Sequence, residues 1–151
     1  MTTLHNILHR TERTRFATDT GRQMHRKLQR IVISDTYSTG DQDLIERICA
    51  TPHLANFFSP LSRTEVPIAG TINNRFISRR IDRMITDDTA HTIMVLDYKT
   101  DVNPDTYRQK YIDQVNEYVQ LLHAVYPNYE ITGYILWTHD FLLEKLPIMR
   151  L

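Results

Sequence analysis

An apolar run from Ile93 to Leu96 stands near the middle of the chain and ends abruptly in Asp97, Tyr98 and Lys99. Four consecutive apolar residues after a polar turn predict a buried central strand. Because side chains alternate along a strand, Asp97 and Lys99 leave one face and Tyr98 leaves the other. Burial of either charge is costly unless the charge is paired or binds a metal. The pattern therefore leaves two interpretations open, a structural ion pair at the strand end or a metal-dependent hydrolytic site.

Two β segments are predicted before this strand. Residues 64–68 form a short strand, and Pro67 places it near the edge of a sheet. Residues 76–85 form a second strand that ends at the Asp87-Asp88 turn. Since the central strand follows this turn directly, we expect an antiparallel hairpin. This hairpin would place Asp82 and Asp97 on neighbouring strands.

The N-terminal part of the chain predicts a helical lead-in. A helix begins at Gly21, and its apolar stripe is formed by Met24, Leu28, Ile31 and Val32. His25 lies on the border of this stripe, where a histidine on its own is more often a core-edge residue than a ligand. Asp41 or Asp43 is expected to cap a second helix that runs to about Ala50. Residues 1–20 are expected to form either a helix or a loose basic arm.

The C-terminal half predicts a helix followed by a strand. Asn103-Pro104 is a strong helix start, with an Asn cap and a proline in the first turn. The expected buried face of this helix consists of Tyr107, Tyr111, Tyr118, Leu122 and Val125. Gln114 lies on the same face, where it either meets a polar partner or reaches water at the edge. Residues 130–138 form another buried strand, and the segment from Phe141 adds an edge strand or a tail. The fold class is therefore α/β, with a central mixed sheet flanked by helices.

Composition narrows the function classes. The 151 residues are expected to form a single domain, residues 1–151, with a core at 21–138. The lone Cys49 excludes an internal disulfide, a cysteine-rich zinc site and a four-cysteine iron–sulfur cluster. Only four glycines are present and none lies in a G-x-x-x-x-G-K-[ST] pattern, so this chain has no ATP-binding loop. No apolar stretch approaches a membrane span and no secretory segment is evident, which predicts a cytoplasmic protein without a membrane partner.

The formal net charge is zero, but the basic residues are unevenly distributed. One basic group lies within residues 1–34 and a second comprises Arg75, Arg79, Arg80 and Arg83. The zero net charge by itself argues against a strongly nucleic-acid-binding domain, since phosphate contacts need Lys and Arg. The clusters predict a surface divided into basic and acidic regions, although an ordinary solvated charged face explains them equally well.

Four features occur in a fixed order along the chain: Gly21-x-x-x-His25, Ile81-Asp82-Arg83, Leu96-Asp97-Tyr98-Lys99-Thr100, and Tyr111-x-x-Gln114-x-x-x-Tyr118. In this order they resemble the nuclease domain of the RecB and AddA helicase–nucleases, within the PD-(D/E)XK superfamily. The resemblance covers about residues 21–138 and implies that superfamily's restriction-endonuclease-like core. Two departures are Ile81, where the superfamily's name places proline, and Arg79, where relatives often have glycine.

The resemblance implies a metal site. Asp82 and Asp97 would bind a divalent ion, together with His25 and the backbone carbonyl of Tyr98, and Lys99 would position or help activate a water. Two nearby carboxylates beside a lysine suit a hard ion such as Mg²⁺, and a histidine ligand would let Mn²⁺ bind well.

Further roles are implied around this site. Gln114 and Tyr118 would orient DNA or the catalytic groups. Glu65 matches an acidic first core strand that is common in the family, although a surface glutamate is an equally good explanation. The arginines expected to contact DNA are Arg22, Arg26, Arg79 and Arg83.

The expected function is thus a metal-dependent deoxyribonuclease, with exonucleolytic or end-processing action. It would be the nuclease module of a DNA-repair helicase–nuclease, fused to or associated with the helicase, or a stand-alone relative. Two alternatives stay open: a DNA-binding or scaffolding domain of the same fold without useful catalysis, and a site-specific endonuclease.

Overall fold

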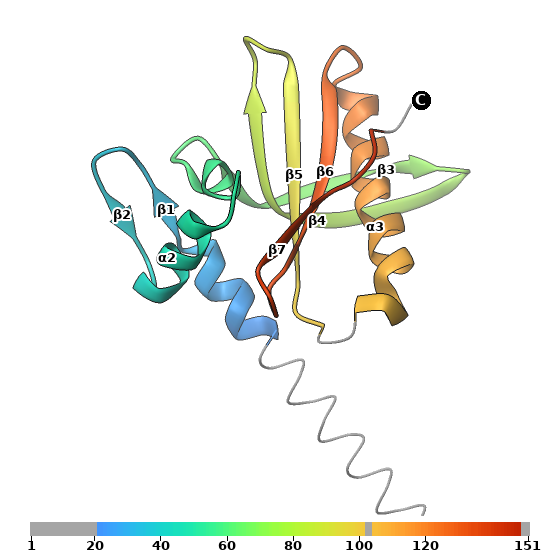
Figure 1. Ribbon diagram of the computed structural model, residues 1–151. Helices are drawn as coiled ribbons and strands as arrows, with labels where there is room; N and C mark the ends of the chain where they lie inside the picture. Colours follow the sequence, from blue (N-terminus) through green and yellow to red (C-terminus); the bar gives the residue numbers. More distant parts are fainter. Residues whose placement is uncertain (1–20, 102–103, 149–151) are drawn as a thin grey trace, which may run out of the picture.

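A five-stranded mixed sheet forms the centre of the protein, with the strand order β3-β4-β5-β6-β7 (Figure 1). The computed structural model describes residues 21–101 and 104–148. The strands are β3 (Arg63–Ile72), β4 (Arg75–Asp87), β5 (Thr92–Lys99), β6 (Glu130–Trp137) and β7 (Leu142–Lys145). Helices flank the sheet, so the predicted α/β class with a mixed sheet is confirmed.

The pairing within the sheet follows the predicted hairpin. β4 and β5 are antiparallel, with Arg83 opposite Leu96 and Asp87 opposite Thr92. β3 also pairs with β4 in antiparallel fashion and forms one edge of the sheet, as Pro67 predicts. β7 pairs with β6 and forms the other edge, so the segment after Phe141 is a strand.

The crossover between β5 and β6 is made by α3 (Pro104–Val125). These two strands are parallel, and parallel neighbours need a connection long enough to return across the sheet. α3 covers the face that carries Val95 and Ile93, where Tyr118 and Leu122 pack against them. The helix begins at Pro104 as predicted, while its expected cap Asn103 lies outside the described residues.

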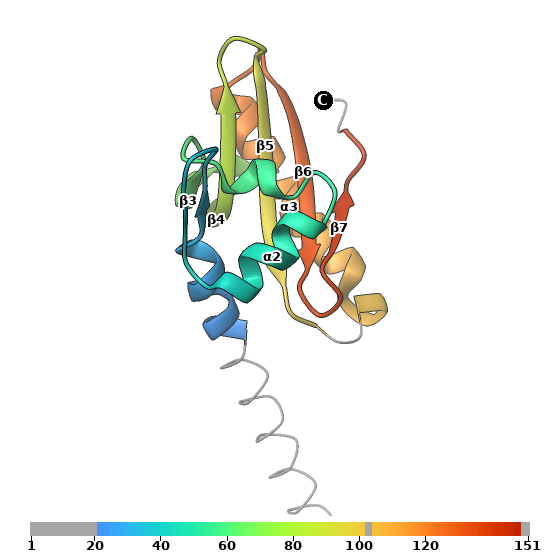
Figure 2. The same cartoon turned by 60° about the vertical axis from the view of Figure 1, so that its left-hand side comes forward.

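The helical lead-in covers the opposite face of the sheet (Figures 1 and 2). It consists of helical residues 21–29, the strands β1 (Val32–Ile33) and β2 (Ser38–Thr39), α2 (Gln42–Ala50) and the 3₁₀ turn η1 (Ala55–Phe58). Asp41 caps α2 as predicted, because its carboxylate accepts the amide of Leu44 at 3.1 Å. The first helix is shorter than predicted: Val32 belongs to β1, because the β-branched run from Ile31 to Ile33 favours a strand. The expectation for residues 1–20 lies outside the described residues.

No helix in the described parts of the chain is both long enough and apolar enough to cross a membrane.

Gly133 in β6 permits a close approach of α3 to the sheet. A Cβ atom at this position would lie 2.5 Å from Cγ1 of the buried Val115. Val115 is β-branched and has little rotamer freedom in a helix, so it cannot turn aside. We expect Gly133→Ala to lower the free energy of unfolding by about 1–3 kcal/mol, measured by urea denaturation.

Gly70→Ala in β3 is the matched control. Its added methyl group would meet only Cδ2 of Leu121, at 2.8 Å, which is the far end of a flexible side chain. The cost of Gly70→Ala should therefore be smaller. Equal losses for the two variants would contradict the assignment of Val115 as the rigid obstacle.

Candidate active site

Two carboxylates meet where β4 and β5 separate. The ladder between these strands ends at the pair Arg83 and Leu96. One position further along, Asp82 stands beside Asp97, and its Oδ2 accepts the backbone amide of Tyr98 at 2.9 Å. The carboxylate of Asp82 therefore accepts the amide that would otherwise make the next backbone hydrogen bond between β4 and β5. This arrangement brings together the two acids that the sequence placed on neighbouring strands.

The bend in β4 explains why Asp82 lies at this point. Ile81 packs in the cluster under α3, whereas Arg83 contacts the lead-in on the opposite face. Regular alternation would put both side chains on one face, so the strand turns between them, as Figure 1 shows. Asp82 occupies the turn and projects toward the end of β5.

His25 approaches Asp82 from the lead-in. Its Nε2 lies 3.4 Å from Oδ2 of Asp82, and its Nδ1 lies 2.8 Å from the carbonyl oxygen of Gly21. Since a carbonyl only accepts, Nδ1 carries a proton. Nε2 donates to the Asp82 carboxylate when the ring is protonated, and it is an acceptor that a metal ion can use when the ring is neutral. The hydrogen bond and charge of Asp82 raise the pKa of His25 above its ordinary value of 6.5.

Lys99 and Gln114 complete the other side of the site. Nζ of Lys99 lies 2.9 Å from Oδ2 of Asp97 and donates to Oε1 of Gln114 at 3.1 Å. Gln114, on α3, thus has the polar partner that its place on the buried face demands. The Asp97 carboxylate is only 3% exposed, and the Lys99 ammonium, though close, makes no aligned hydrogen bond to Oδ2. This buried oxygen is therefore available to a further positive group.

The two carboxylates have opposite pKa shifts. Burial raises the pKa of Asp97 to about 7, the charge of Asp82 adds to the rise, and Lys99 partly offsets it. Burial also acts to raise the pKa of Asp82, but the hydrogen bonds from His25, Asp97 and the Tyr98 amide outweigh it and lower the pKa. The buried pair therefore tends to keep one proton unless a further cation lies beside it.

Tyr118 and the Tyr98 backbone border the carboxylates. Tyr118 is buried on α3, and burial followed by the charges of Asp97 and Asp82 raises the pKa of its hydroxyl. The amide of Tyr98 points toward Asp82, and the carbonyl of a strand residue points to the same side as its amide. The Tyr98 carbonyl is thus directed into the gap between β4 and β5, consistent with the ligand role predicted for it.

Glu65 stands next to Asp82 on the neighbouring strand, because Thr64 pairs with Arg83 and Val66 pairs with Ile81. Its carboxylate lies 3.7 Å from Nη1 of Arg80, and its backbone has a positive φ of 51°. The described contact of Glu65 is therefore an ion pair on the strand surface. Its catalytic role stays a prediction.

The arginines predicted to contact DNA have different surroundings. Arg22 and Arg26 are exposed on the helical segment 21–29. Arg79 is partly exposed and lies 3.6 Å from Glu117 of α3. Contacts of these three residues with DNA stay predictions.

The prediction that Arg83 contacts DNA is wrong. The residue is 1% exposed, and its guanidinium donates to the hydroxyls of Tyr98 and Ser62, to the carbonyl of Leu28 and to further backbone carbonyls. It also lies over the ring of Phe58, 4.2 Å from the ring centre. A guanidinium so enclosed has no surface to offer DNA. Arg83 holds the lead-in to the sheet instead.

The sequence placed Tyr111 on the buried face of its helix and in the pattern with Gln114 and Tyr118, but it gave Tyr111 no role in the site. Nζ of Lys99 lies 4.5 Å from the centre of the Tyr111 ring, and the Tyr111 hydroxyl donates to Asp101. The spacing of three residues from Gln114 is the signal for this placement, since residues at i and i+3 share a helix face. An ammonium over an aromatic face is stabilised by the ring quadrupole.

The donor set fits a hard divalent ion. Within the described residues, no group of three or more His, Cys, Asp or Glu side chains is arranged as a preformed metal site. Oδ2 of Asp97, which is buried and has the Lys99 ammonium nearby but no aligned hydrogen bond, nevertheless lies beside Asp82, Nε2 of His25 and the Tyr98 carbonyl. Oxygen donors with one imidazole suit Mg²⁺ and, better, Mn²⁺.

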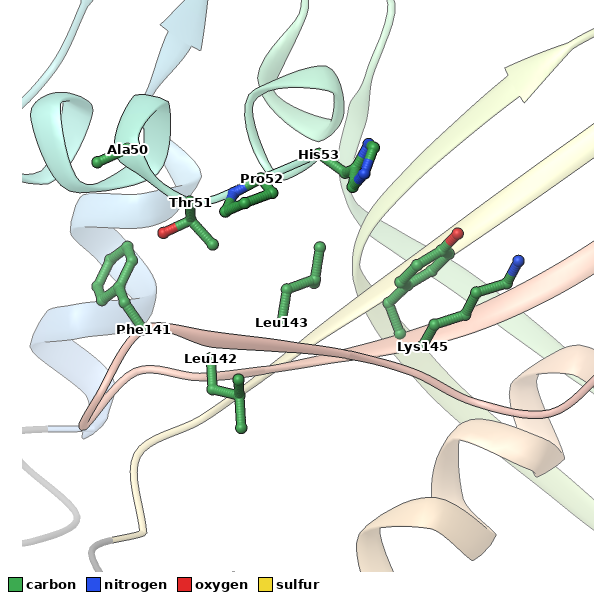
Figure 3. A pocket seen from close by; sticks show the side chains of 9 residues that line it. Ala50, Thr51, Pro52, His53, Phe141, Leu142, Leu143 and Lys145 are labelled. Carbon is green, nitrogen blue, oxygen red and sulfur yellow. The ribbon is translucent and has the colours of Figure 1, made fainter.

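A separate pocket lies away from these residues. It has a volume of about 720 Å³ and is formed between the end of α2 and the β6–β7 edge (Figure 3). Phe141, Leu143 and Tyr134 line it together with His53 and Lys145, and none of its lining residues is acidic. This pocket lacks the carboxylate pair that hydrolytic metal chemistry needs.

Comparison with known proteins gives no assignment: no family model matches the chain, and no curated protein matches it.

Replacing Asp97 by asparagine is expected to stabilise the metal-free protein. The folded-state pKa of Asp97 is raised to about 7, above its ordinary value of 3.8. Ionised Asp97 therefore costs stability, and the cost appears as pH rises from about 4 to 7 and is complete above 7. At pH 8 in EDTA, Asp97→Asn should raise the free energy of unfolding by about 1–3 kcal/mol, measured by urea denaturation. At pH 4 the gain should nearly vanish, and a variant less stable than the wild type at both pH values would contradict this account.

Proposed function

We propose that this protein is a metal-dependent deoxyribonuclease of the PD-(D/E)XK type, related to the nuclease module of RecB- and AddA-like helicase–nucleases. The observation that carries the proposal is the convergence of His25, Asp82, Asp97, Lys99 and Gln114 on one point from four separate elements. These residues lie far apart in the sequence, in the order of the motifs that suggested the family. The α/β fold with a mixed sheet is compatible with the core of that superfamily.

The carboxylates would provide the metal site. Asp82, Asp97, the Tyr98 carbonyl and Nε2 of His25 would hold Mg²⁺ or Mn²⁺. When bound, the ion supplies positive charge for the phosphate and lowers the pKa of a nearby water. A bound ion would also lower the pKa of Asp97, which burial first and the charge of Asp82 second hold at about 7.

Lys99 would orient the water and the phosphate. An ammonium has three donors. Asp97 and Gln114 occupy two directions around Nζ, and the Tyr111 ring lies on a further side. The remaining donor can hold the attacking water or a phosphate oxygen, where its charge stabilises the transition state more than the ground state.

The reaction is hydrolysis of a phosphodiester. The water oxygen forms a bond to phosphorus, the bond from phosphorus to the leaving sugar oxygen breaks, and the proton lost by the water ends on the leaving oxygen. With Nε2 of His25 holding the ion, Lys99 is the group beside the carboxylates that can carry a proton. The geometry does not require a covalent intermediate with the protein.

The decisive test is cleavage of DNA. The protein is incubated with linear single-stranded, linear double-stranded and circular plasmid DNA, in Mg²⁺, in Mn²⁺ or in EDTA. We expect cleavage that requires metal and is lost in Asp97→Ala, whereas Asp43→Ala, which removes an exposed carboxylate from the first turn of α2, should cleave normally. Cleavage confined to linear DNA would support exonucleolytic or end-processing action, and cuts at fixed positions in the plasmid would support a site-specific endonuclease.

Calorimetric titration with Mn²⁺ separates the nuclease from a scaffolding domain of the same fold. A nuclease should bind the ion through Asp82 and Asp97 and lose binding in Asp97→Ala. Absence of metal binding together with retained DNA binding would overturn the proposal in favour of the scaffolding domain.

A further inference from the structure

The first half of β4 leaves the main sheet and forms a ribbon with β3. Residues from Arg75 to Ile81 pair with β3 alone, since the pairing of β4 with β5 extends only from Arg83 to Asp87. The ribbon ends in a tight turn at Asn73 and Asn74, whose φ angles of 51° and 62° are those of a two-residue hairpin turn with a rigid tip. Figure 1 shows this ribbon crossing the sheet and extending past α3.

The two faces of the ribbon differ sharply. One face packs on α3: Ile77 is buried there, Gly70 meets Leu121, and Arg79 pairs with Glu117. The opposite face, which we call the outer face, consists of six residues that are all exposed: Pro67, Ala69, Thr71, Phe76, Ser78 and Arg80. They stand in three cross-strand pairs, in which Thr71 faces Phe76, Ala69 faces Ser78 and Pro67 faces Arg80.

The chemistry of the outer face suits a nucleic acid strand. Phe76 is 71% exposed at the tip end, and its neighbours toward Arg80 are small, so a flat base can reach its ring. Aromatic rings on an open sheet surface stack on unpaired bases without regard to sequence. The neighbours of Phe76 on the outer face are small, so its ring has no stacking partner within the ribbon.

The charge of the ribbon complements phosphates. Of the three arginines between Glu65 and Asp82, only Arg80 belongs to the outer face, since Arg75 and Arg79 lie on the face toward α3. Arg80 is 69% exposed and its ion pair with Glu65 is on the surface, where exchange of one anionic partner for another costs little. Arg80 can thus exchange Glu65 for a phosphate near the base of the ribbon.

The ribbon leads to the candidate active site, because Asp82 is the residue at which β4 turns into the main sheet. We infer that the outer face of the β3–β4 ribbon binds a single strand of DNA, with Arg80 on its backbone and Phe76 stacked on a base about 20 Å from Asp82. This inference rests on the proposed function for the chemistry at the ribbon's base. A duplex is a poorer occupant, since its base faces are already stacked and closed to Phe76.

Binding is tested without cleavage, in EDTA, by fluorescence anisotropy of a labelled 20-nucleotide oligo(dT) at several salt concentrations. Phe76→Leu keeps an apolar side chain but removes the stacking ring, and it should weaken binding about tenfold with an unchanged salt slope. Arg80→Gln should reduce the slope of log affinity against log salt by about 0.7, as loss of one phosphate contact requires. The same oligonucleotide in duplex form should be insensitive to Phe76→Leu.

Two controls match these variants. Tyr37→Leu removes an exposed aromatic ring from the β1–β2 turn, and Lys145→Gln removes an exposed charge from the opposite edge of the sheet. Both should bind like the wild type. Wild-type affinity in Phe76→Leu and Arg80→Gln, or an equal loss on duplex and single strand, would overturn the ribbon proposal. Absence of cleavage with Mg²⁺ or Mn²⁺ despite these binding effects would instead overturn the nuclease and leave the ribbon standing.

Discussion

Replacing Lys99 by methionine is expected to lower the rate of DNA cleavage by about a thousandfold while the protein stays folded. Methionine fills nearly the same volume, so the packing against Tyr111 survives. What is lost is the ammonium that lies 2.9 Å from Asp97 and donates to Gln114 at 3.1 Å. A charge that stabilises the phosphate only as it develops in the transition state affects kcat far more than substrate binding.

Single-turnover cleavage in saturating Mn²⁺ measures this loss directly. Circular dichroism should show a folded variant, and calorimetry should show that Mn²⁺ still binds, since Lys99 is not a ligand. Lys110→Met, an exposed lysine on α3, serves as the control and should cleave like the wild type. A Lys99→Met protein that cleaves within tenfold of the wild type would remove Lys99 from the catalytic groups.

Gln114 allows a graded version of the same experiment. Gln114→Glu keeps an acceptor for Lys99, whereas Gln114→Leu removes it and leaves the ammonium with one polar partner fewer. We expect about a tenfold loss of kcat in Gln114→Leu and a smaller loss in Gln114→Glu, because the residue acts by orienting Lys99. Equal losses would indicate that Gln114 contacts the substrate itself.

The central part of the site could be predicted because it depends on short-range rules. A hairpin between residues 76–85 and the central strand fixes which side chains stand opposite one another, and a register set by the turn brings Asp82 beside Asp97. Alternation along β5 places Lys99 on the face of Asp97 and sends Tyr98 to the other side. Helical spacing then brings Gln114 and Tyr118 to the same place.

The surroundings of the site depend on longer-range contacts that leave no local pattern. Nothing in the run Arg79-Arg80-Ile81-Asp82-Arg83 distinguishes the arginine that faces solvent from the one that is buried. The bend at Asp82 makes the difference, since it turns Arg83 toward backbone carbonyls more than fifty positions away in the chain. The spacing from Gln114 places Tyr111 on the same helix face, but it does not show that Lys99 packs on the ring, because an aromatic residue on a helix stripe is usually an ordinary core residue.

We expect the second large effect from removal of the Arg83 guanidinium. Arg83→Met should lower the free energy of unfolding by about 3–5 kcal/mol. The guanidinium donates to the Tyr98 hydroxyl at 2.9 Å, to Ser62 at 2.7 Å and to the Leu28 carbonyl at 2.9 Å. Without it these buried acceptors lose their donor, and each unsatisfied group costs about 1–3 kcal/mol.

The position of Arg83 relative to the first helix adds to this loss. Its contacts include the carbonyls of Leu28 and Ile31, at the end of helical residues 21–29, where a positive charge also favours the helix dipole. The same helix carries His25, which lies 3.4 Å from Asp82. Loss of Arg83 should therefore loosen His25 as well as the lead-in.

Urea denaturation of Arg83→Met beside Arg80→Met measures the effect. Arg80 lies three residues earlier on the same strand but is exposed, so its loss should change stability by about 0.5 kcal/mol or less. DNA binding at low temperature then separates the two roles an arginine can have. A folded Arg83→Met should keep the wild-type slope of log affinity against log salt, because the enclosed guanidinium contacts no phosphate. A slope reduced by about 0.7 would show that Arg83 does contact DNA.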